Sequence, residues 1–326
     1  MGAQVVNVIS RETIEEAHER IRPYIRRTPV LQSNDLDQEL GCRAFLKCEN
    51  LQEIGAFKAR GAINTVLQIP ENKLAGGIAT HSSGNHAQAV ALAAQIVSTQ
   101  AFIVMPSNSL EIKKKKVLAL GAKIFECEPT QSAREEMLEE IIKKTNAIEV
   151  HPFNDLRIIA GQATAARELV EEQSDLDFVL APVGGGGLLS GTCLSIQHFS
   201  PSTKVIGCEP SGADDAFRSL QSGQIEVSQA QTIADGLRTS LGTKTYPVIR
   251  QLVDRIITVT DEEIVFAMKL VFDKMKLLIE PSSAVTIAAL LKEKEVFANK
   301  RVGIIVTGGN IDPSHAQKLF ETYRLG

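Results

Sequence analysis

Short apolar runs alternate with longer amphipathic stretches along most of this chain. The short runs predict strands, and the stretches with apolar positions every three or four residues predict helices. The predicted strands span residues 44–46, 78–80, 101–104, 123–125, 178–181, 205–208, 256–259 and 302–306. The predicted helices span residues 58–67, 86–95, 110–120, 133–144, 158–171, 188–198 and 262–274. This alternation is typical of α/β proteins, in which helices cover mostly parallel sheets.

An earlier helix is predicted to begin at Thr13. Thr13 and Glu16 have the spacing of a capping box, in which a hydroxyl and a carboxylate satisfy free amides at a helix start. Apolar residues follow at helical spacing, at Ile14, Ala17, Ile21 and Ile25. Pro23 lies inside this pattern and is expected to end or kink the helix, because proline removes a backbone donor.

The composition narrows the class of protein. With 326 residues, 44% of them apolar and 23% charged, the chain can form two domains with substantial cores. A net charge of −4 without a basic pole predicts no binding to nucleic acid or to an anionic membrane. We find no apolar stretch of the roughly 18 residues that a membrane span needs. The absence of tryptophan argues against an aromatic platform for nucleic acid or sugar.

The cysteines favour a cytoplasmic location. They are odd in number, show no metal-type CxxC spacing and are expected to be reduced, packed thiols; they are Cys42, Cys48, Cys127, Cys193 and Cys208. The first residues also lack the basic and apolar regions of a signal peptide.

Four consecutive glycines form the sharpest local signal. They lie between a predicted strand and a predicted helix, at Gly184, Gly185, Gly186 and Gly187, and are followed by Leu188. Without side chains, the backbone amides can converge on an oxyanion while the helix dipole points at the same place. The pattern therefore favours a phosphate site, with a tight turn as the alternative. It matches neither G-x-G-x-x-G nor a Walker loop, so a dinucleotide or a nucleoside triphosphate is not indicated.

A second polar loop, residues 80–86, also joins a strand to a helix. Its side chains Ser82, Ser83 and Asn85 suit a carboxylate, which a helix N-terminus also attracts. The alternative is a polar cluster that only caps the helix. His81 and His86 flank the loop, but neither has a third metal ligand nearby in the sequence.

Two further positions are candidates for a role in catalysis or in binding a heterocycle. Lys58 stands among small and apolar residues at a predicted helix start, where desolvation lowers the pKa of an amine and makes it a nucleophile able to form an imine. A solvated surface lysine is the alternative. Thr307, after the last predicted strand and before Gly308 and Gly309, could hold a heterocycle nitrogen, or the segment could be a plain glycine turn.

Taken in their order along the chain, the segments at Lys58, at residues 83–86, at the four glycines and at residues 307–310 resemble those of the serine/threonine dehydratase and serine racemase family of fold-type II enzymes that use pyridoxal 5′-phosphate (PLP). The resemblance extends from residue 25 to residue 310. It implies an α/β, tryptophan synthase β-like fold with two open, twisted, mostly parallel sheets flanked by helices. It also implies a large PLP-binding domain of residues 1–75 and 151–326, a small mobile domain of residues 76–150, and a homodimer. A small amino acid is the expected substrate.

The resemblance also implies roles for individual residues. Lys58 would form the imine with PLP and act as acid and base on one face of the substrate. Other cofactor contacts would come from Phe57, Asn85, Gly184, Gly185, Gly186, Gly187, Leu188, Gly236, Glu280 and Thr307. The substrate would contact Ser82, Ser83, Asn85, His86, Arg134 and Thr239. The hydroxyl of Thr307 is too weak an acid to protonate the pyridine, which favours prompt loss of a β-hydroxyl over transamination.

Some positions are similar to the racemase-like branch of this family. Glu209, the carbonyl of Ala213 and Asp215 match its divalent-cation site, and such hard oxygen donors suit Mg²⁺, Ca²⁺ or Mn²⁺. By its residues alone, this acidic stretch is better interpreted as a solvated loop. Ser83 matches a serine that protonates the substrate from the face opposite Lys58, as racemisation requires.

Three departures from the family pattern bear on this assignment. Ala56 replaces a serine that often precedes Phe-Lys, and Ala163 replaces a glycine. Phe153 stands where vertebrate members of the racemase branch have asparagine, and an aromatic residue there is common among dehydratases. The chain ends soon after Asn310, so we expect no regulatory domain and no feedback inhibition by isoleucine.

The leading prediction is dehydration and deamination of L-serine and L-threonine to a 2-oxo acid and ammonia. Serine racemisation, alone or as a second activity, and dehydration of 3-hydroxyaspartate are the alternatives within the family. A non-catalytic binding protein that retains only the phosphate loop is an alternative from another class, and Lys58 argues against it. The missing G-x-G-x-x-G disfavours a nucleotide-dependent oxidoreductase. The lysine run 113–116 is expected to be a solvated helix face.

Overall fold

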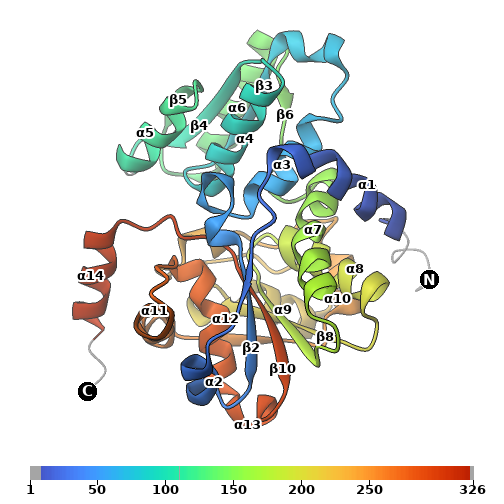
Figure 1. The fold of residues 1–326 in the computed structure, drawn as a ribbon. Helices are drawn as coiled ribbons and strands as arrows, with labels where there is room; N and C mark the ends of the chain where they lie inside the picture. The colour runs from blue at the N-terminus through green and yellow to red at the C-terminus, as the bar shows by residue number, and fades with distance from the viewer. Residues whose placement is uncertain (1–8, 110, 324–326) are drawn as a thin grey trace.

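The computed structural model describes residues 9–109 and 111–323, which form two sheets flanked by helices (Figure 1). The larger sheet has six strands. Their spatial order is β1 (Val30–Leu31), β2 (Arg43–Cys48), β10 (Arg301–Val306), β7 (Phe178–Pro182), β8 (Lys204–Pro210) and β9 (Arg255–Val259). Only the short edge strand β1 runs antiparallel to its neighbour. The strands of this sheet therefore come from both ends of the chain.

The smaller sheet has four parallel strands. Their order is β5 (Lys123–Cys127), β4 (Ala101–Pro106), β3 (Ile78–His81) and β6 (Ile148–Glu149). All four come from one continuous stretch of the chain, and the sheet lies at the top of Figure 1. The polar loop 82–84 begins directly after β3.

Neighbouring parallel strands need crossover connections, and helices provide most of them in this chain. Their bounds are α1 (Arg11–Ile21), α2 (Asn34–Leu40), α3 (Lys58–Val66), α4 (Asn85–Ile96), α5 (Glu111–Ala119), α6 (Gln131–Thr145), α7 (Leu156–Glu172), α8 (Gly187–Phe199), α9 (Asp215–Ser222), α10 (Tyr246–Leu252), α11 (Asp261–Met275), α12 (Pro281–Lys292), α13 (Lys294–Phe297) and α14 (Pro313–Thr322). No helix in the part of the chain that the structure describes is both long and apolar enough to cross a membrane.

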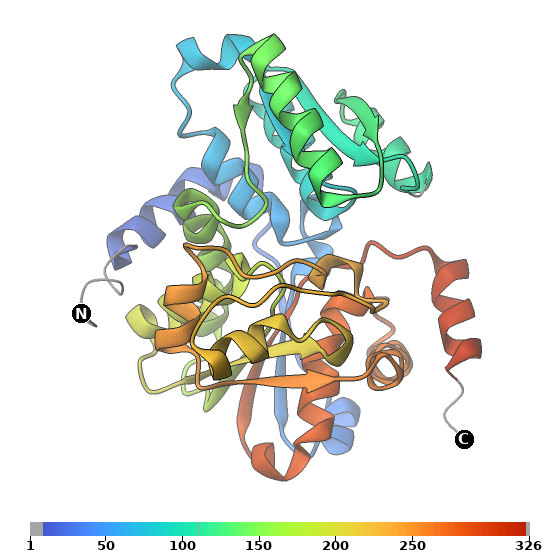
Figure 2. The same cartoon turned by 180° about the vertical axis from the view of Figure 1, so that it is seen from behind.

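Apolar side chains cover both faces of each sheet. In β2, Ala44 and Leu46 pack with α11 and α12, whereas Phe45 packs with α7 and α8, because successive strand residues face opposite sides. In the smaller sheet, Ile103 packs toward α4 and Val104 toward α6. The helix α6 is the green helix in front of that sheet in Figure 2.

Every predicted strand is present, and each is longer than predicted. The prediction of the first helix start is wrong, because Ser10 caps the helix from three residues earlier and accepts a hydrogen bond from the amide of Thr13. The helix then ends at Ile21, before Pro23, as expected. The predicted helix 110–120 is α5, and its predicted first residue, Leu110, lies outside the described residues.

Candidate active site

Lys58 is the first residue of α3, a helix that lies between the two sheets (Figure 1). Its Nζ atom donates a hydrogen bond to the carbonyl of Pro152 at 2.8 Å and lies 5.3 Å from the ring centroid of Phe57. Burial lowers the pKa of Lys58 from its usual range to about 8. Among the described residues, no carboxylate forms an ion pair with this amine. Lys58 therefore has the features of a nucleophilic amine rather than of a structural cation.

The preceding residue connects this amine to the larger sheet. The amide of Phe57 donates to the carbonyl of Thr307 at 3.0 Å, and Ala56 forms an isolated bridge with Gly308. Thr307 follows β10 directly and is buried. The structure thus brings Phe57, Lys58 and Thr307 together, although about 250 residues separate them along the chain.

A second hydroxyl holds the side chain of Thr307. The two oxygens Thr307 Oγ1 and Ser283 Oγ lie 2.8 Å apart. Ser283 Oγ also accepts a hydrogen bond from the amide of Gly308 at 2.8 Å. Sequence reasoning assigned no role to Ser283, and its only signal was its place in the Pro-Ser-Ser segment after Glu280.

The four glycines connect β7 to α8 in a densely packed loop. Gly186 has a φ of +87°, a conformation that favours glycine. A Cβ atom on Gly185 would lie 2.3 Å from the ring of Phe153, so no side chain fits there. Gly187 begins α8, and no side chain caps this helix. Free amides at the start of a 13-residue helix suit a phosphate, and the residues present therefore fit the phosphate group of PLP.

Two other predicted positions lie on a segment that packs against this loop. A Cβ atom on Gly184 would lie 3.2 Å from the carbonyl oxygen of Gly236, and the amide of Gly236 donates to Ser282 Oγ at 3.0 Å. Thr239 is exposed, three residues farther along the same segment. Gly242, later in that segment, donates its amide to the carbonyl of Gly185 at 3.4 Å.

Asn85 and Glu280 form a direct pair across the two sheets. Asn85 Nδ2 donates to Glu280 Oε1 at 2.9 Å, and Asn310 Nδ2 donates to Asn85 Oδ1 at 2.8 Å. Burial raises the pKa of Glu280 to about 7. A Cβ atom on Gly308 would lie 2.5 Å from Glu280 Oε1, so this glycine makes room for the carboxyl group.

The polar loop 82–84 leads into α4. The amide of Ser82 donates to the carbonyl of Val104, and Ser82 Oγ accepts from the amide of Gly84 at 3.3 Å. Ser83 is partly exposed. The ring atom His86 Nε2 lies 2.9 Å from the carbonyl of Val150, and burial lowers the pKa of His86 well below its usual range. His86 Nδ1 has no hydrogen-bond partner among the described residues. Because the low pKa keeps the ring uncharged and Nε2 is engaged, we expect His86 to offer a carboxylate its backbone amide rather than its ring.

Arg134 lies in the first turn of α6, a helix that packs on β3 and β4. Its Nε atom is buried and has no hydrogen-bond partner in the structure. Burial, and then the charge of Arg134, lower the pKa of His81. Arg134 therefore adds a positive charge beside the polar loop.

Two carboxyl groups at the predicted metal site are buried together. Glu209 lies at the end of β8 and accepts hydrogen bonds from the amides of Ala216 and Phe217, both at 3.0 Å. Neither oxygen of Asp215 accepts a well-aligned hydrogen bond from the described residues, although Ser228, the amide of Leu241 and the charge of Arg218 all act to lower its pKa. Burial dominates, and it raises the pKa of Glu209 to about 9 and that of Asp215 to about 6.

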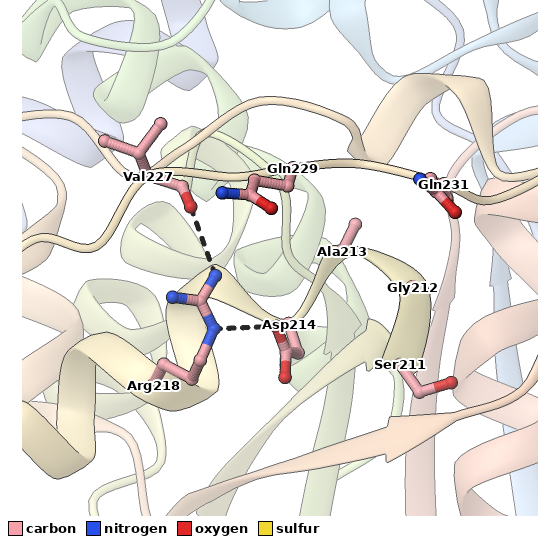
Figure 3. A pocket seen from close by; sticks show the side chains of 8 residues that line it. All are labelled: Ser211, Gly212, Ala213, Asp214, Arg218, Val227, Gln229 and Gln231. Atoms are coloured by element: carbon pink, nitrogen blue, oxygen red, sulfur yellow. Dashed lines mark hydrogen bonds and ion pairs between the residues drawn. The ribbon is translucent and has the colours of Figure 1, made fainter.

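Ala213 lies between these two acids in the sequence and lines a pocket of about 410 Å³ (Figure 3). Arg218 in this pocket donates to Asp214 and to the carbonyl of Val227, so Asp214 is already paired. No group of three or more His, Cys, Asp or Glu side chains suited to a metal lies within the described residues. Two carboxylates without a cation partner and a carbonyl nevertheless fit a hard divalent cation.

The expectation of a solvated lysine face on α5 holds for Lys115 and Lys116, which are exposed, and is corrected for Lys114. Lys113 forms an ion pair with Asp235, and Lys116 donates to Asn310 Oδ1 at 2.9 Å. Lys114 is buried against Glu126 at 2.6 Å. Lys113 and Lys116 therefore contact segments of the chain that also contain Gly236 and Thr307, two of the predicted cofactor residues.

The structure unites most of the predicted cofactor residues. Lys58 contacts Phe57 and Pro152, Phe57 in turn contacts Thr307, and Phe153 next to Pro152 packs on the glycine loop. The sequence pattern did not predict the groups that hold Lys58 and Thr307 in place, chiefly the carbonyl of Pro152 and the hydroxyl of Ser283.

Comparison with known proteins identifies this arrangement. The family described as "Pyridoxal-phosphate dependent enzyme" matches residues 21–308. A beta-hydroxyaspartate dehydratase of Paracoccus denitrificans (strain Pd 1222) is 49% identical over 302 residues, which cover 92% of this chain and 96% of the relative. A serine racemase of Dictyostelium discoideum is 44% identical over 316 residues, which cover 95% and 98%.

Solved structures agree. The crystal structure of a serine racemase from Dictyostelium discoideum has a TM-score of 0.89 and 44% identity, and the match covers 93% of this chain and 99% of that one. The α/β fold with two mostly parallel sheets, and the likeness to the racemase-like branch, are confirmed. This chain belongs to the family of pyridoxal-phosphate-dependent enzymes.

Proposed function

We propose that this chain eliminates the β-hydroxyl of a small amino acid, with L-serine and L-threonine as leading substrates. Elimination releases water, and the enamine product then takes up water to give a 2-oxo acid and ammonia. The observation that carries the proposal is the amine of Lys58, desolvated and without a carboxylate partner among the described residues. Such an amine is suited to hold a cofactor aldehyde and to move a proton.

The other residues around Lys58 would hold the cofactor and the substrate. The amides of residues 184–188 would hold the phosphate, and Phe57 and Asn85 would flank the ring. Thr307 would face the pyridine nitrogen with a hydroxyl that Ser283 holds in place. PLP supplies the electron sink that makes the α-proton of an amino acid acidic. Lys58 would take that proton, and the loop 82–86 would hold the substrate carboxylate.

Dehydration of 3-hydroxyaspartate is a second candidate. It is favoured by the buried, unpartnered Nε atom of Arg134 near His81, because a second carboxylate would supply the missing acceptor. The relative from Paracoccus denitrificans bears the name of this activity. Racemisation is the third, and Ser83 would then protonate the substrate from the face opposite Lys58.

We propose a divalent cation, with Mg²⁺ as the leading candidate and Ca²⁺ or Mn²⁺ as alternatives, at Glu209, the carbonyl of Ala213 and Asp215. The support is a pair of buried acids that form no ion pair among the described residues. Because a divalent cation would offset their shared charge, its role is structural support for the segment between β8 and α9.

Three further expectations are proposals of the same kind. Residues 76–150 would form a small domain that closes over the substrate and excludes water, and residues 1–75 and 151–326 would form the large domain. The chain would act as a homodimer in the cytoplasm. Support for the location is that all five cysteines are free and buried.

The deciding experiment incubates the purified protein with PLP and Mg²⁺ and with L-serine, D-serine, L-threonine or the 3-hydroxyaspartates, one at a time. The 2-oxo acid and the enantiomer of each amino acid are measured together. Keto acid from L-serine or L-threonine without enantiomer supports the leading proposal. Turnover confined to 3-hydroxyaspartate would replace it with the second candidate, and abundant enantiomer would replace it with racemisation.

A further inference from the structure

Two residues after Lys58, the side chain of Arg60 is fully buried in a cluster of charged groups. Arg60 Nε and Nη2 donate to the two oxygens of Glu49 at 2.7 and 2.8 Å. Arg60 Nη1 and Nη2 donate to the two oxygens of Glu168 at 2.8 Å each. Arg60 Nη1 also donates to Thr164 Oγ1 at 3.1 Å. An arginine has five N–H donors, so all of them are used.

Neighbouring groups complete this cluster. Lys47 Nζ lies 2.6 Å from Glu168 Oε2 and donates to the carbonyl of Thr28 at 2.6 Å. Thr28 Oγ1 donates to Glu49 Oε1 at 2.5 Å. Two cations, Arg60 and Lys47, therefore offset two carboxylates, Glu49 and Glu168, and all four side chains are buried.

The cluster joins three elements that position the site. Arg60 lies on α3, Glu49 follows β2, and Glu168 lies on α7. Removing four charges from water is costly, and apolar residues of similar volume often fold as well or better. The planar fork of arginine, by contrast, fixes direction as well as distance. What the cluster supplies beyond apolar packing is therefore a defined orientation of α3.

That orientation bears directly on Lys58. Residues two apart on a helix point about 200° from each other. Arg60 lies on the side of α3 that faces β2 and α7. Because its hydrogen bonds fix the rotation of the helix about its axis, they also fix the direction in which Lys58, on the opposite side of the first turn, points. No side chain caps α3 at Phe57, and the amide of Gly61 in its first turn donates a weak hydrogen bond to Gln162 Oε1 at 3.3 Å. The contact of α3 with α7 at Gly61 and Gly161 is a close backbone approach, which limits the distance between helices more than their rotation.

We propose that Arg60, held by Glu49 and Glu168, is a positioning residue that aims the amine of Lys58 at the cofactor and the substrate. This inference rests on the proposed role of Lys58 as the cofactor-bound lysine. It predicts that a change in the geometry of the Arg60 fork reduces the reactivity of Lys58 even where the charge and the fold are kept.

The test compares wild type with Arg60→Lys, which keeps the charge and loses the fork. Apoprotein is mixed with PLP, and the rate of appearance of the lysine–cofactor absorbance band is followed from pH 6 to pH 10. This readout needs no substrate, so a wrong choice of substrate leaves it intact. We expect the rate at pH 7.5 to fall about tenfold, and its pH midpoint to rise from near 8 toward the ordinary lysine value as the amine becomes better hydrated. In turnover, kcat should fall with little change in KM.

The matched control is Val271→Ala in α11, a buried position of the larger-sheet core. It should lower the unfolding temperature without changing band formation. Thr164→Val removes one acceptor of Arg60, together with the hydrogen bond from Thr164 Oγ1 to the carbonyl of Gly161, and serves as a milder variant if Arg60→Lys does not fold. We expect about a two- to threefold loss of rate in the same direction.

Unchanged rates and pH midpoint in a folded Arg60→Lys or Thr164→Val protein would overturn the inference and leave the proposed function standing. Lys58→Ala separates the two failures. If that variant still formed the absorbance band, the assignment of Lys58 would be wrong, and the positioning role of Arg60 would be refuted with it.

Discussion

Two pairs of buried carboxyl groups in this chain have opposite surroundings. Glu49 and Glu168 lie against Arg60 and Lys47. For Glu168, burial alone would raise the pKa, but the hydrogen bonds and charge of Arg60 and Lys47 outweigh it and lower the pKa to about 2. Glu209 and Asp215 form no ion pair among the described residues, and burial raises their pKa values to about 9 and 6.

The difference separates buried charges that support the fold from buried groups that can bind a ligand or react. A buried charge whose partners are all present is inert and fixes geometry, whereas a buried group that lacks a partner is ready to bind or react. The same contrast holds for cations on α3. Arg60 donates to two carboxylates, and the Lys58 amine donates to a backbone carbonyl, so the first is a support and the second a nucleophile.

The largest expected effect comes from removing the uncompensated amine. Lys58→Ala should abolish the lysine–cofactor absorbance band and lower kcat at least about 10³-fold, because proton transfer by a positioned group contributes in that range and covalent attachment is lost as well. The measurement is the visible spectrum together with keto-acid release. Lys47→Met, which removes a compensated cation, should keep the band and lose stability instead. An absorbance band of normal intensity in Lys58→Ala would contradict the assignment of Lys58 as the reactive amine.

Next in size is the loss of a compensated acid. Glu168→Ala leaves Arg60 and Lys47 buried without one of their partners, and we expect a loss of about 3–5 kcal/mol in the free energy of unfolding. Urea denaturation at pH 7 measures it. Adding Mg²⁺ should not restore this stability, since the defect is a missing anion. A loss below about 1 kcal/mol would show that the cluster is not as tightly coupled as its contacts indicate.

Supplying the missing cation to the other pair should have a smaller effect of opposite sign. At about 100 times its dissociation constant, Mg²⁺ should stabilise the protein by about 2.7 kcal/mol. Asp215→Asn should abolish that gain while leaving the metal-free protein as stable as wild type, because it removes an uncompensated charge. Thermal unfolding with and without Mg²⁺ provides the comparison, and equal gains in both proteins would place the cation elsewhere.

The smallest effect is the acid sensitivity of the compensated pair. Glu168 has a folded-state pKa of about 2, below its ordinary value of 4.5, so its contribution is complete above pH 4.5 and is lost as the pH falls toward 2. The slope in that window should be about 1 kcal/mol per pH unit and always below about 1.4. Urea denaturation between pH 5 and pH 3 measures the slope, and Glu168→Gln should reduce it. An unchanged slope in that variant would mean that other carboxyl groups dominate acid unfolding.

Much of the fold was predictable because local periodicity reports it. Each apolar run that predicts a strand has become one, and the four glycines connect a strand to a helix as their pattern indicates. The edge strands β1 and β6 have only two residues each and leave no periodicity to detect. Helix starts were less certain because equivalent capping residues, such as Ser10 and Thr13, stand three positions apart.

The candidate site, like the fold, could be predicted from the sequence only in part. The sequence alone determined the alternation of elements, the glycine loop, and the order of loops that resembles a known family. Only the tertiary structure decided which charged side chains meet. Lys58 and Arg60 are two residues apart and both basic, yet Glu168, 108 positions after Arg60, neutralises one of them and not the other. Coulomb and desolvation energies depend on distances in space and on burial, and neither is encoded in separation along the chain.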